Sequence, residues 1–432
     1  MVRYDQTVEF LYRLQWHGIR LDLDPTLRLL LGIGNPHLNY PVIHVGGTNG
    51  KGSTAAMTAS VFRDAGYSVG LYTSPHLLDF TERIRINGRP IAQAQVAELT
   101  EEIRAAVPVG IEPTFFEFTT AMAFFAFARA GVDLVVAEVG MGGRLDATNV
   151  VTPVVSVITN VEVDHQRYLG EHRTDIAREK AGIIKHGVPL ITAVTHPEVR
   201  EVLRARARAA ESPVVMIGSD AWVEGDSPAC FSYHGPTLTI PNLTCPLRGR
   251  HQMTNAATAI AAVEAARQRG LVIAEASIRR GIARVLWEGR LEEVRARPTI
   301  IVDGAHNPAG AEALARFLED ERARRGGRLT IIFGILADKD LEGIIGRVGP
   351  LADEVILTQP TYHRAAPLEA MKAAAASVQV PVRVVPALAR ALEDVETRMA
   401  PDDWCVVTGS LYTVGEVKAI YQGLRHPSPL RG

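Results

Sequence analysis

A glycine-rich segment near the start of the chain, VIHVGGTNGKGST (Val42–Thr54), has the residue types of a phosphate-binding loop. Its glycines let backbone N–H groups approach a polyphosphate, and a helix that opens at Ser53 adds a favourable dipole. Lys51 supplies a positive charge for the outer phosphates, and the hydroxyl of Ser53 or Thr54 can reach Mg²⁺. The segment therefore predicts a nucleotide site with contacts from Thr48, Asn49, Gly50, Lys51, Gly52 and Ser53.

The spacing of this loop departs from the common pattern GxxxxGK[ST]. Val45 stands at the first glycine position, and Gly52 separates Lys51 from Ser53. The alternative is a glycine-rich turn between a strand and a helix, but the flanking pattern favours a phosphate loop. Because motors, switches, kinases and ligases all use such loops, the rest of the chain must decide the function.

The loop sits in a regular alternation of short apolar runs and helical stretches. Strands are predicted at VIHVG (42–46), SVGLYT, DLVVAEVG and VVSVITN, and helices at residues 53–66, 92–106 and 118–129. Near-continuous apolar strands that alternate with helices are typical of a parallel sheet covered on both faces. The sequence therefore predicts an α/β domain built around the phosphate loop.

The pattern changes twice further along the chain. Around Ser212–Pro246 the pieces VVMIG, FSYHG and TLTIP predict a small antiparallel excursion, followed by a helix over residues 255–267. From Thr299 onward five strands alternate with helices: TIIVDGAH, LTIIFGIL, EVILTQP, VRVVP and WCVVTGS. Because the pattern breaks near Arg295–Pro298, we expect an N-terminal domain over 1–296 and a smaller α/β domain over 297–432.

Composition limits the function classes. The chain has 432 residues, 47% hydrophobic and 22% charged, with a formal net charge of −2. This balance argues against broad attraction to nucleic acid or to an anionic membrane. The most apolar run, Phe118–Ala128, is too short for a bilayer, which takes about 20 residues. The spacing of the three cysteines matches no zinc-binding or CxxC pattern. No signal peptide and no coiled-coil pattern occurs in the sequence. We therefore expect a cytoplasmic monomer without nucleic-acid or membrane partners.

Several motifs carry a family resemblance. The form GTNGKGS (47–53) resembles the Mur-ligase superfamily. Further segments are similar to the folylpolyglutamate/dihydrofolate synthase family and occur in its order between about residues 40 and 420: YTSPHLLDFTERIRING, AEVGMGGRLDATN, ITNVEVDHQRYLG, IAREKAGIIK, HQMTNAATA, VDGAHNPAG, GILADKD and TGSLYTVGEV.

The resemblance implies both a fold and a reaction. The fold is a P-loop parallel-sheet domain followed by a Rossmann-like α/β domain, with the active site between them. In the reaction, ATP phosphorylates a carboxylate of dihydropteroate or a reduced folate. The amino group of L-glutamate then attacks the acyl phosphate and forms an amide. The implied cofactor is Mg²⁺, at two sites.

The resemblance also implies catalytic and metal-binding residues. Ser53, Ser74, Glu138 and His165 correspond to metal ligands, and Lys180 to a lysine carried as a carbamate; Lys51, Lys180 and His165 are the implied catalytic residues. Each has an ordinary alternative by type alone: a turn residue for Ser74, a salt-bridged strand end for Glu138, a surface or core residue for His165, and a solvated helix lysine for Lys180.

Asn255, Arg290 and Asp303 are implied contacts for the base and ribose of ATP, with His306 near the phosphates. Asn255 also suits a helix N-cap. Glu288 stands where the family usually has proline.

The acceptor pocket implied by the resemblance takes in Thr114, Phe115, Arg144, Leu145 and Asp146. Core packing is the alternative for Phe115 and for its neighbour Phe116. His363 and Arg364 are predicted to bind the carboxylates of glutamate. The alternative is that Arg364 is an ordinary surface arginine.

Two rival functions remain at this point. Another Mur-type amino-acid ligase shares the phosphate loop and mechanism, although Ser74–His76 and the GGRLDATN segment argue against it. A P-loop switch without ligase chemistry needs neither the second α/β unit nor the candidate metal ligands. A nicotinamide dehydrogenase is disfavoured because no GxGxxG follows an opening strand.

Overall fold

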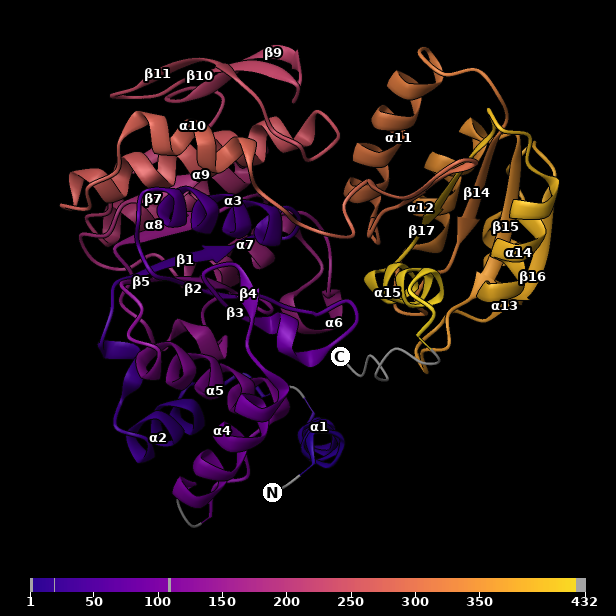
Figure 1. Ribbon diagram of the computed structural model, residues 1–432. Helices are drawn as coiled ribbons and strands as arrows, with labels where there is room; N and C mark the ends of the chain where they lie inside the picture. Colours follow the sequence, from indigo (N-terminus) through magenta and orange to yellow (C-terminus); the bar gives the residue numbers. More distant parts are fainter. Residues whose placement is uncertain (1–2, 19, 108–109, 425–432) are drawn as a thin grey trace.

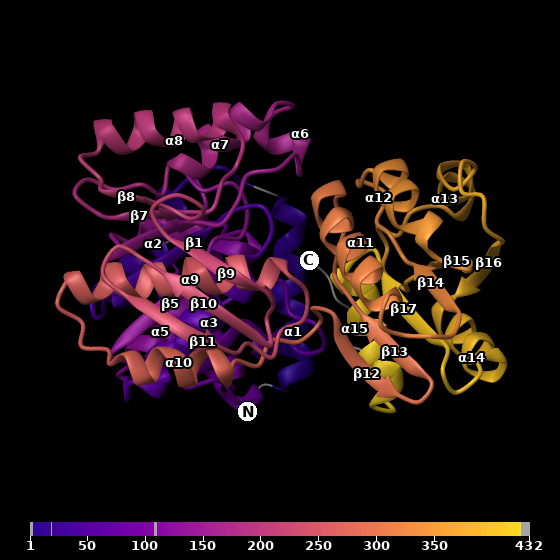
Figure 2. The same cartoon turned by 90° about the horizontal axis from the view of Figure 1, so that it is seen from above.

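The computed structural model describes residues 3–18, 20–107 and 110–424, which form two α/β domains. The N-terminal domain lies on the left of Figure 1 and the C-terminal domain on the right, and the view from above shows the same separation (Figure 2). The predicted α/β architecture with two sheet-centred domains is therefore confirmed.

An eight-stranded sheet forms the centre of the N-terminal domain, in the order β4-β3-β2-β5-β1-β6-β7-β8. The strands from β2 to β8 pair in parallel, whereas β3 and β4 add an antiparallel edge. Their bounds are β1 Val42–Gly46, β2 Val69–Tyr72, β3 Ile84–Ile86, β4 Arg89–Pro90, β5 Leu134–Glu138, β6 Val155–Ile158, β7 Leu190–Thr192 and β8 Val214–Met216. The four predicted strands β1, β2, β5 and β6 are fully buried.

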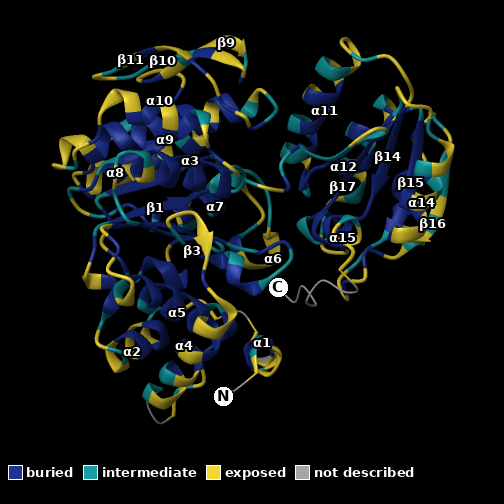
Figure 3. Ribbon diagram, in the orientation of Figure 1, coloured by how far each residue is buried: buried dark blue, intermediate teal, exposed yellow. Residues whose placement is uncertain are grey.

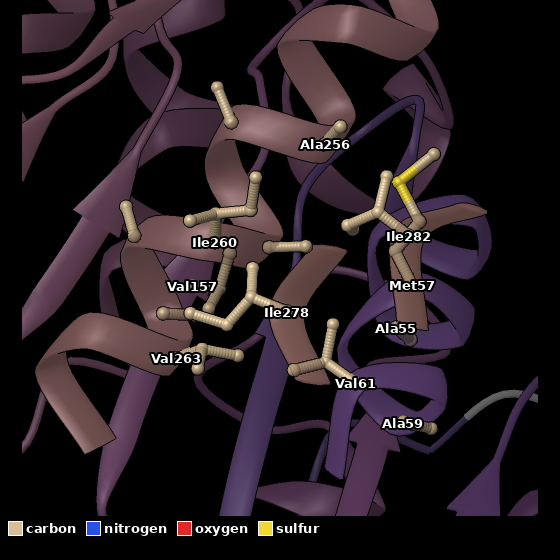
Figure 4. Close-up of a cluster of buried hydrophobic side chains, with 14 of the residues drawn as sticks. Ala55, Met57, Ala59, Val61, Val157, Ala256, Ile260, Val263, Ile278 and Ile282 are labelled. Atoms are coloured by element: carbon tan, nitrogen blue, oxygen red, sulfur yellow. The ribbon is translucent and has the colours of Figure 1, made fainter. Parts of the chain in front are cut away.

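Helices cover both faces of this sheet because successive strand residues point to opposite sides. Val45 packs with α3 (Lys51–Asp64), α9 (His251–Gln268) and α10 (Glu275–Ala283). The side chains of Met57, Val61, Ile260 and Ile278 form this layer (Figure 4). Val42, three residues before Val45 in the same strand, faces the opposite layer. This layer consists of the helices α1 Tyr4–Arg13, α2 Asp24–Gly32, α4 Gln93–Ala106 and α5 Phe115–Arg129.

The remaining elements of this domain flank the sheet. The helices α7 (Arg173–Ala181) and α8 (Pro197–Ala209) pack beside β7. Shorter helices are η1 Leu14–His17, η2 Pro36–Leu38, η3 Phe80–Arg83, η4 Ala147–Val150 and α6 Gln166–Leu169. No helix in the described ranges is both long enough and apolar enough to span a bilayer.

The antiparallel excursion is smaller than predicted at one end. It contains β9 (Trp222–Ser227), β10 (Cys230–His234) and β11 (Thr239–Leu243), which lie over α9 and α10 (Figure 1). The piece VVMIG does not belong to it, because β8 pairs in parallel with β7 at the edge of the large sheet. The sequence of a short apolar strand does not indicate whether it pairs with its neighbouring strand in parallel or antiparallel. The strand β9 was missed because most of its residues are polar and exposed.

The C-terminal sheet has the order β12-β13-β17-β14-β15-β16, and all its strands except β12 pair in parallel. The five predicted strands are confirmed as β13 Thr299–Val302, β14 Leu329–Phe333, β15 Glu354–Gln359, β16 Val382–Ala387 and β17 Trp404–Thr408. The helices are α11 Pro308–Arg322, α12 Leu341–Val348, η5 Gly349–Leu351, α13 Leu368–Ala374, α14 Leu388–Arg398 and α15 Leu411–Tyr421. The central strands of both sheets are buried, and exposed residues gather on the outer helices (Figure 3).

The predicted domain boundary at 296/297 falls inside the C-terminal sheet. The strand β12 (Glu292–Ala296) pairs with β13, so this sheet already begins at Glu292. The Arg, Ala and Pro residues near Arg295–Pro298 interrupt the pattern because they turn one strand of a hairpin into the next. They do not form the linker, and the boundary therefore lies before Glu292.

Candidate active site at the domain interface

The phosphate loop joins β1 to α3, and backbone conformation requires two of its glycines. Gly47 has a φ of 139° and Gly50 a φ of 80°, values that favour glycine. A Cβ on Gly47 would lie 1.9 Å from Oγ1 of Thr159. The helix begins at Lys51, two residues before the predicted start, so the N–H groups of its first turn surround the loop. Lys51 Nζ donates to the carbonyl oxygen of Thr48 at 3.1 Å.

Thr48 and Asn49, predicted as nucleotide contacts, are tied to the segment after β6. The Asn49 backbone N–H donates to Oδ1 of Asn160 at 2.7 Å, and the Glu162 N–H donates to Oγ1 of Thr48 at 3.0 Å. Thr48 Oγ1 in turn donates to the carbonyl oxygen of Glu162 at 3.2 Å. These bonds fix the shape of the loop and engage the side chain of Thr48 and the backbone N–H of Asn49 within the protein.

Glu138 lies one strand away from the loop. It ends β5 opposite Val45 of β1, and it is buried. The Ser74 backbone N–H donates to its Oε2 at 3.3 Å. Burial raises the pKa of Glu138, and the charge of Lys51 opposes the rise. No ion pair in the described residues involves this carboxylate, so a bound cation would serve as its counter-charge.

The surrounding residues fit a magnesium ion. Across residues 3–18, 20–107 and 110–424, no group of three or more His, Cys, Asp or Glu side chains forms a metal-binding cluster. Mg²⁺ commonly takes one or two carboxylates and completes its shell with water and substrate phosphates. Glu138 beside Ser74, with Ser53 at the loop, supplies such a set. His165 is 39% exposed, with its Nε2 4.0 Å from Oδ1 of Asp164, and partial desolvation lowers its pKa to about 4.

Lys180 lies beneath the phosphate loop. Its ammonium group is buried at the end of α7, and Nζ donates to the carbonyl oxygen of Gly47 at 2.8 Å. Burial lowers the pKa of Lys180 to about 7, and the charge of Lys51 adds to the shift. The alternative of a solvated helix lysine is therefore wrong.

The predicted nucleotide residues come from both domains. Asn255 lies against the loop, because a Cβ on Gly50 would be 2.5 Å from its Oδ1. It is not an N-cap, since α9 already begins at His251. Asp303 directly follows β13 and accepts hydrogen bonds from the Leu291 and Ala305 N–H groups at 3.0 and 2.9 Å.

Arg290 lies in the connection between the domains. Its Nη1 donates to the carbonyl oxygen of Gly289 at 3.0 Å. Burial lowers the pKa of Arg290, and the negative charges of Asp303 and Glu138 partly offset this decrease. Glu288, the departure from the family pattern, pairs with Lys418 at 3.1 Å. Its charge is thereby offset by a buried lysine of α15.

A polar bridge that sequence reasoning missed joins the domains at the phosphate loop. The side-chain amides of Asn49 and Asn307 donate to each other's Oδ1 at 3.0 Å. Asp164 accepts from Asn307 at 3.1 Å and pairs with Lys339 at 2.6 Å. His306, predicted near the phosphates, lies 3.4 Å from Asp164. Besides Asn49, the residues of the bridge lie in the segments ITNVEVDHQRYLG, VDGAHNPAG and GILADKD, and Asn307 is expected near the phosphates, but nothing in the sequence indicates that these side chains meet.

The structure separates the predicted acceptor residues into two groups. Thr114 caps α5 and accepts from the Glu117 N–H at 3.3 Å. Phe115 is buried and stacks on Tyr12 with ring centroids 5.8 Å apart. Its neighbour Phe116 is only half-buried and covers Gly140, where a Cβ would meet its ring at 2.3 Å.

The GRLD turn lies beside the metal candidates. Asp146 is buried and accepts from the Met141 and Thr148 N–H groups at 2.9 and 3.0 Å. Burial raises its pKa against those hydrogen bonds. Arg144 is exposed and pairs with Glu179 at 2.9 Å, and Leu145 is half-buried.

His363 and Arg364, predicted for glutamate, lie exposed after β15. Arg364 pairs with Asp338 at 3.0 Å, next to Lys339 in sequence. The two residues therefore lie on the C-terminal side of the interdomain bridge. A cleft between the domains is lined by Thr73, His76, Arg85, Trp287, Arg290 and Leu411.

Comparisons with known proteins agree with this arrangement. The Mur ligase middle domain matches residues 45–263, and the Mur ligase glutamate ligase domain matches residues 289–411. The chain is 34% identical to a dihydrofolate synthase/folylpolyglutamate synthase of Bacillus subtilis, covering 93% of this chain and 95% of the relative. It is 37% identical to a folylpolyglutamate synthase of Lacticaseibacillus casei, covering 98% and 99%.

Solved structures show the same similarity. Escherichia coli FolC in complex with DHPP and ADP superposes with a TM-score of 0.88 at 32% identity, covering 97% of this chain and 98% of that one. The Mycobacterium tuberculosis folylpolyglutamate synthase complexed with ADP gives a TM-score of 0.88 at 36% identity, covering 98% and 99%.

Proposed function

The chain belongs to the dihydrofolate synthase/folylpolyglutamate synthase family of Mur ligases, and we propose that it joins L-glutamate to the carboxylate of dihydropteroate or a reduced folate. It is an ATP-dependent acid–amino-acid ligase of this family. One observation carries the proposal for the site. The phosphate loop, the buried Glu138 and the buried Lys180 meet where the two domains join.

The loop and its neighbours would hold the triphosphate. Backbone N–H groups between Gly50 and Ser53 and the ammonium group of Lys51 face the phosphates, while Asn255, Arg290 and Asp303 bind the base and ribose. Fixed positive groups of this kind stabilise the charge that develops as a phosphoryl group is transferred. His306 lies beside the same phosphates from the second domain.

Ser53, Ser74, Glu138 and His165 would hold Mg²⁺. When bound, the metal neutralises charge on the transferred phosphate and orients its oxygens. The chain's own part is to keep this region buried, so that each electrostatic interaction is stronger than in water.

Lys180 supports a second proposal about the metal site. Only the neutral amine reacts with CO₂: the nitrogen forms a bond to carbon and loses a proton, which gives a carbamate anion. A pKa of about 7 leaves a large neutral fraction at physiological pH. The carbamate would add a negative charge beneath the loop and help to hold a second metal.

The acceptor would lie against the half-buried Phe116 with Asp146, Arg144 and Leu145 near its polar edge, and Thr114 and Phe115 would shape the pocket from behind. Glutamate would be bound from the C-terminal domain by His363 and Arg364. Asp146 favours dihydrofolate synthase activity in addition to tail extension. We further propose a cytoplasmic monomer that acts on small molecules only, with no nucleic-acid or membrane partner.

The decisive experiment measures phosphate release from ATP with glutamate present. Dihydropteroate, a reduced folate and no acceptor are compared, and mass spectrometry identifies the bond formed. Release that depends on a folate-type acceptor, with an amide product, supports the proposal. Equal release without acceptor would favour a P-loop switch, and use of a UDP-sugar peptide instead would favour another Mur-type ligase.

A further inference from the structure

Arg83 is a buried cation to which none of the roles above has been assigned. It ends the short helix η3 (Phe80–Arg83), and only 3% of the residue is exposed. Its carbonyl oxygen accepts from the Thr73 N–H at 3.0 Å. The backbone of Arg83 is therefore fixed to the segment that carries Ser74, close to the candidate metal ligands.

Neutral groups surround the guanidinium. Arg83 Nε donates to Nδ1 of His76 at 2.8 Å, and the guanidinium carbon lies 5.0 Å from the ring centroid of Phe115 and 6.0 Å from that of Phe80. Because Nδ1 accepts this hydrogen bond it carries no proton, so the imidazole is neutral, and its Nε2 lies 3.2 Å from the hydroxyl of Tyr12. None of these neighbours neutralises the positive charge.

The missing counter-charge distinguishes Arg83 from two other cations of the interface, Lys418 and Lys339. Lys418 pairs with Glu292 at 2.5 Å, and Lys339 pairs with Asp164 at 2.6 Å. Within the described part of the chain, no ion pair joins Arg83 to a carboxylate, and its two terminal nitrogens make no hydrogen bond; they are not among the fully buried unpartnered atoms, so a ligand can reach them. A buried charge without a partner is unfavourable. A ligand that supplies the partner would remove this cost.

Arg83 also lies where the two domains meet. Glu82, its neighbour in sequence, and Arg85 line the cleft between the domains. His76, which accepts from its Nε, lines the same cleft with Arg290 and Leu411. Arg83 therefore lies directly behind the lining of this cleft.

We propose that Arg83 binds a substrate carboxylate at the domain interface, through the two terminal nitrogens that have no partner in the protein. The inference rests on the proposed function, which supplies the ligand. The planar guanidinium matches a carboxylate in two parallel hydrogen bonds. Glutamate brings carboxylates that do not react, and a reduced folate brings an α-carboxylate on its tail. Dihydropteroate has only the carboxylate that is consumed.

The test compares Arg83→Met and Arg83→Lys with a matched control, Arg104→Met. Arg104 also lies over a phenylalanine ring, 4.6 Å from the centroid of Phe10, but it is exposed and paired with Glu101. The KM values of glutamate, a reduced folate and dihydropteroate are measured for each variant and for the wild type. Arg83→Met should raise the KM of a carboxylate-bearing substrate about 10- to 100-fold, as expected for losing charged hydrogen bonds.

The variants also separate binding from a structural role. Arg83→Lys keeps the charge but loses the paired geometry, so its KM should lie between those of the wild type and Arg83→Met. The melting temperature of Arg83→Met should equal or exceed that of the wild type, because an unpaired buried charge has been replaced by an apolar chain. If Arg83→Met does not fold, Arg83→Lys alone decides, with a rise in KM of about tenfold expected.

The pattern of KM values identifies the source of the carboxylate. A rise for glutamate with either acceptor assigns Arg83 to the amino acid. A rise for the reduced folate without one for dihydropteroate assigns it to the folate tail. Values within about twofold of the wild type for all three substrates would overturn the inference, as would a fall in kcat alone. If the wild type forms no amide at all, it is the proposed function that fails.

Discussion

The ion pair between Lys339 and Asp164 crosses the domain interface, and its removal gives a sharp prediction. Both side chains are nearly buried, at 7% and 8% exposed, and the atoms Nζ and Oδ1 are 2.6 Å apart. Burial alone would raise the pKa of Asp164. A hydrogen bond from His306 and nearby positive charge, including that of Lys339, instead lower that pKa below its usual range. The aspartate is therefore ionised at neutral pH, and the pair is fully charged.

The change Lys339→Met removes the cation and keeps a chain of similar length. Removing one partner of a buried pair typically costs about 3–5 kcal/mol. Asp164 retains the Asn307 amide at 3.1 Å, and water reaches it when the domains separate. We therefore assign about 2 kcal/mol to the equilibrium between closed and separated domains, a factor of about 30.

The assay combines kinetics with solution scattering. Lys339→Met should lower kcat/KM about 30-fold and increase the radius of gyration in small-angle X-ray scattering. The melting temperature should stay close to that of the wild type, because separated domains rehydrate Asp164 without unfolding. Lys339→Arg should retain most of the activity, and Lys372→Met, on an exposed surface of α13, serves as the control.

Two results would refute this reasoning. A Lys339→Met enzyme with kcat/KM within threefold of the wild type and an unchanged radius of gyration would mean that the pair does not hold the domains together. A large fall in melting temperature would mean that the pair stabilises the fold of a domain and not the contact between domains.

Three further predictions concern the phosphate loop. Lys51→Ala should lower acceptor-dependent phosphate release about 100- to 1,000-fold with an unchanged circular dichroism spectrum, and near wild-type ligation would exclude the loop assignment. Because the neutral fraction of Lys180 falls about tenfold per pH unit below its pKa of about 7, the carbamate signal in ¹³C NMR with labelled bicarbonate should grow from pH 6 to 8. Lys180→Ala should abolish that signal and reduce turnover more than ATP affinity; a signal that persists would come from another amine. Gly47→Ala, at a φ of 139° and 1.9 Å from Thr159 Oγ1, should lower the free energy of unfolding in urea by about 1–3 kcal/mol, whereas an unchanged midpoint would contradict the strain argument.

Local sequence patterns predicted the buried strands correctly, but they did not predict where the helices begin. The run VIHVG forms β1 over Val42–Gly46, as predicted, because a continuous apolar run bounded by glycine has one low-energy placement. The helix predicted from Phe118 begins at Phe115, since Thr114 and Glu117 form a capping box ahead of the apolar run. That signal was present in the sequence, but hydrophobic periodicity alone does not report it.

The same distinction holds for the residues of the candidate site: those contiguous in sequence could be predicted, and those brought together by the fold could not. The phosphate loop is contiguous in sequence, so residue types and spacing identify it. The bridge between Asp164 and Lys339 joins residues 175 positions apart, and the hydrogen bond from Arg83 to His76 depends on a turn whose geometry no periodicity specifies. Lysine and arginine are usually exposed, and only tertiary packing decides which of them are buried.

The pKa shifts at the site connect residues that the sequence presents separately. Burial raises the pKa of Glu138 and lowers that of Lys180, so both shifts disfavour charge. The charge of Lys51 opposes the first shift and enlarges the second. The ammonium group of Lys51 thus opposes protonation of Glu138 and favours the neutral amine of Lys180. Because these effects share one charge, the contributions of Lys51 and Lys180 to turnover cannot be independent, as residues that act as a unit show strongly non-additive mutational effects.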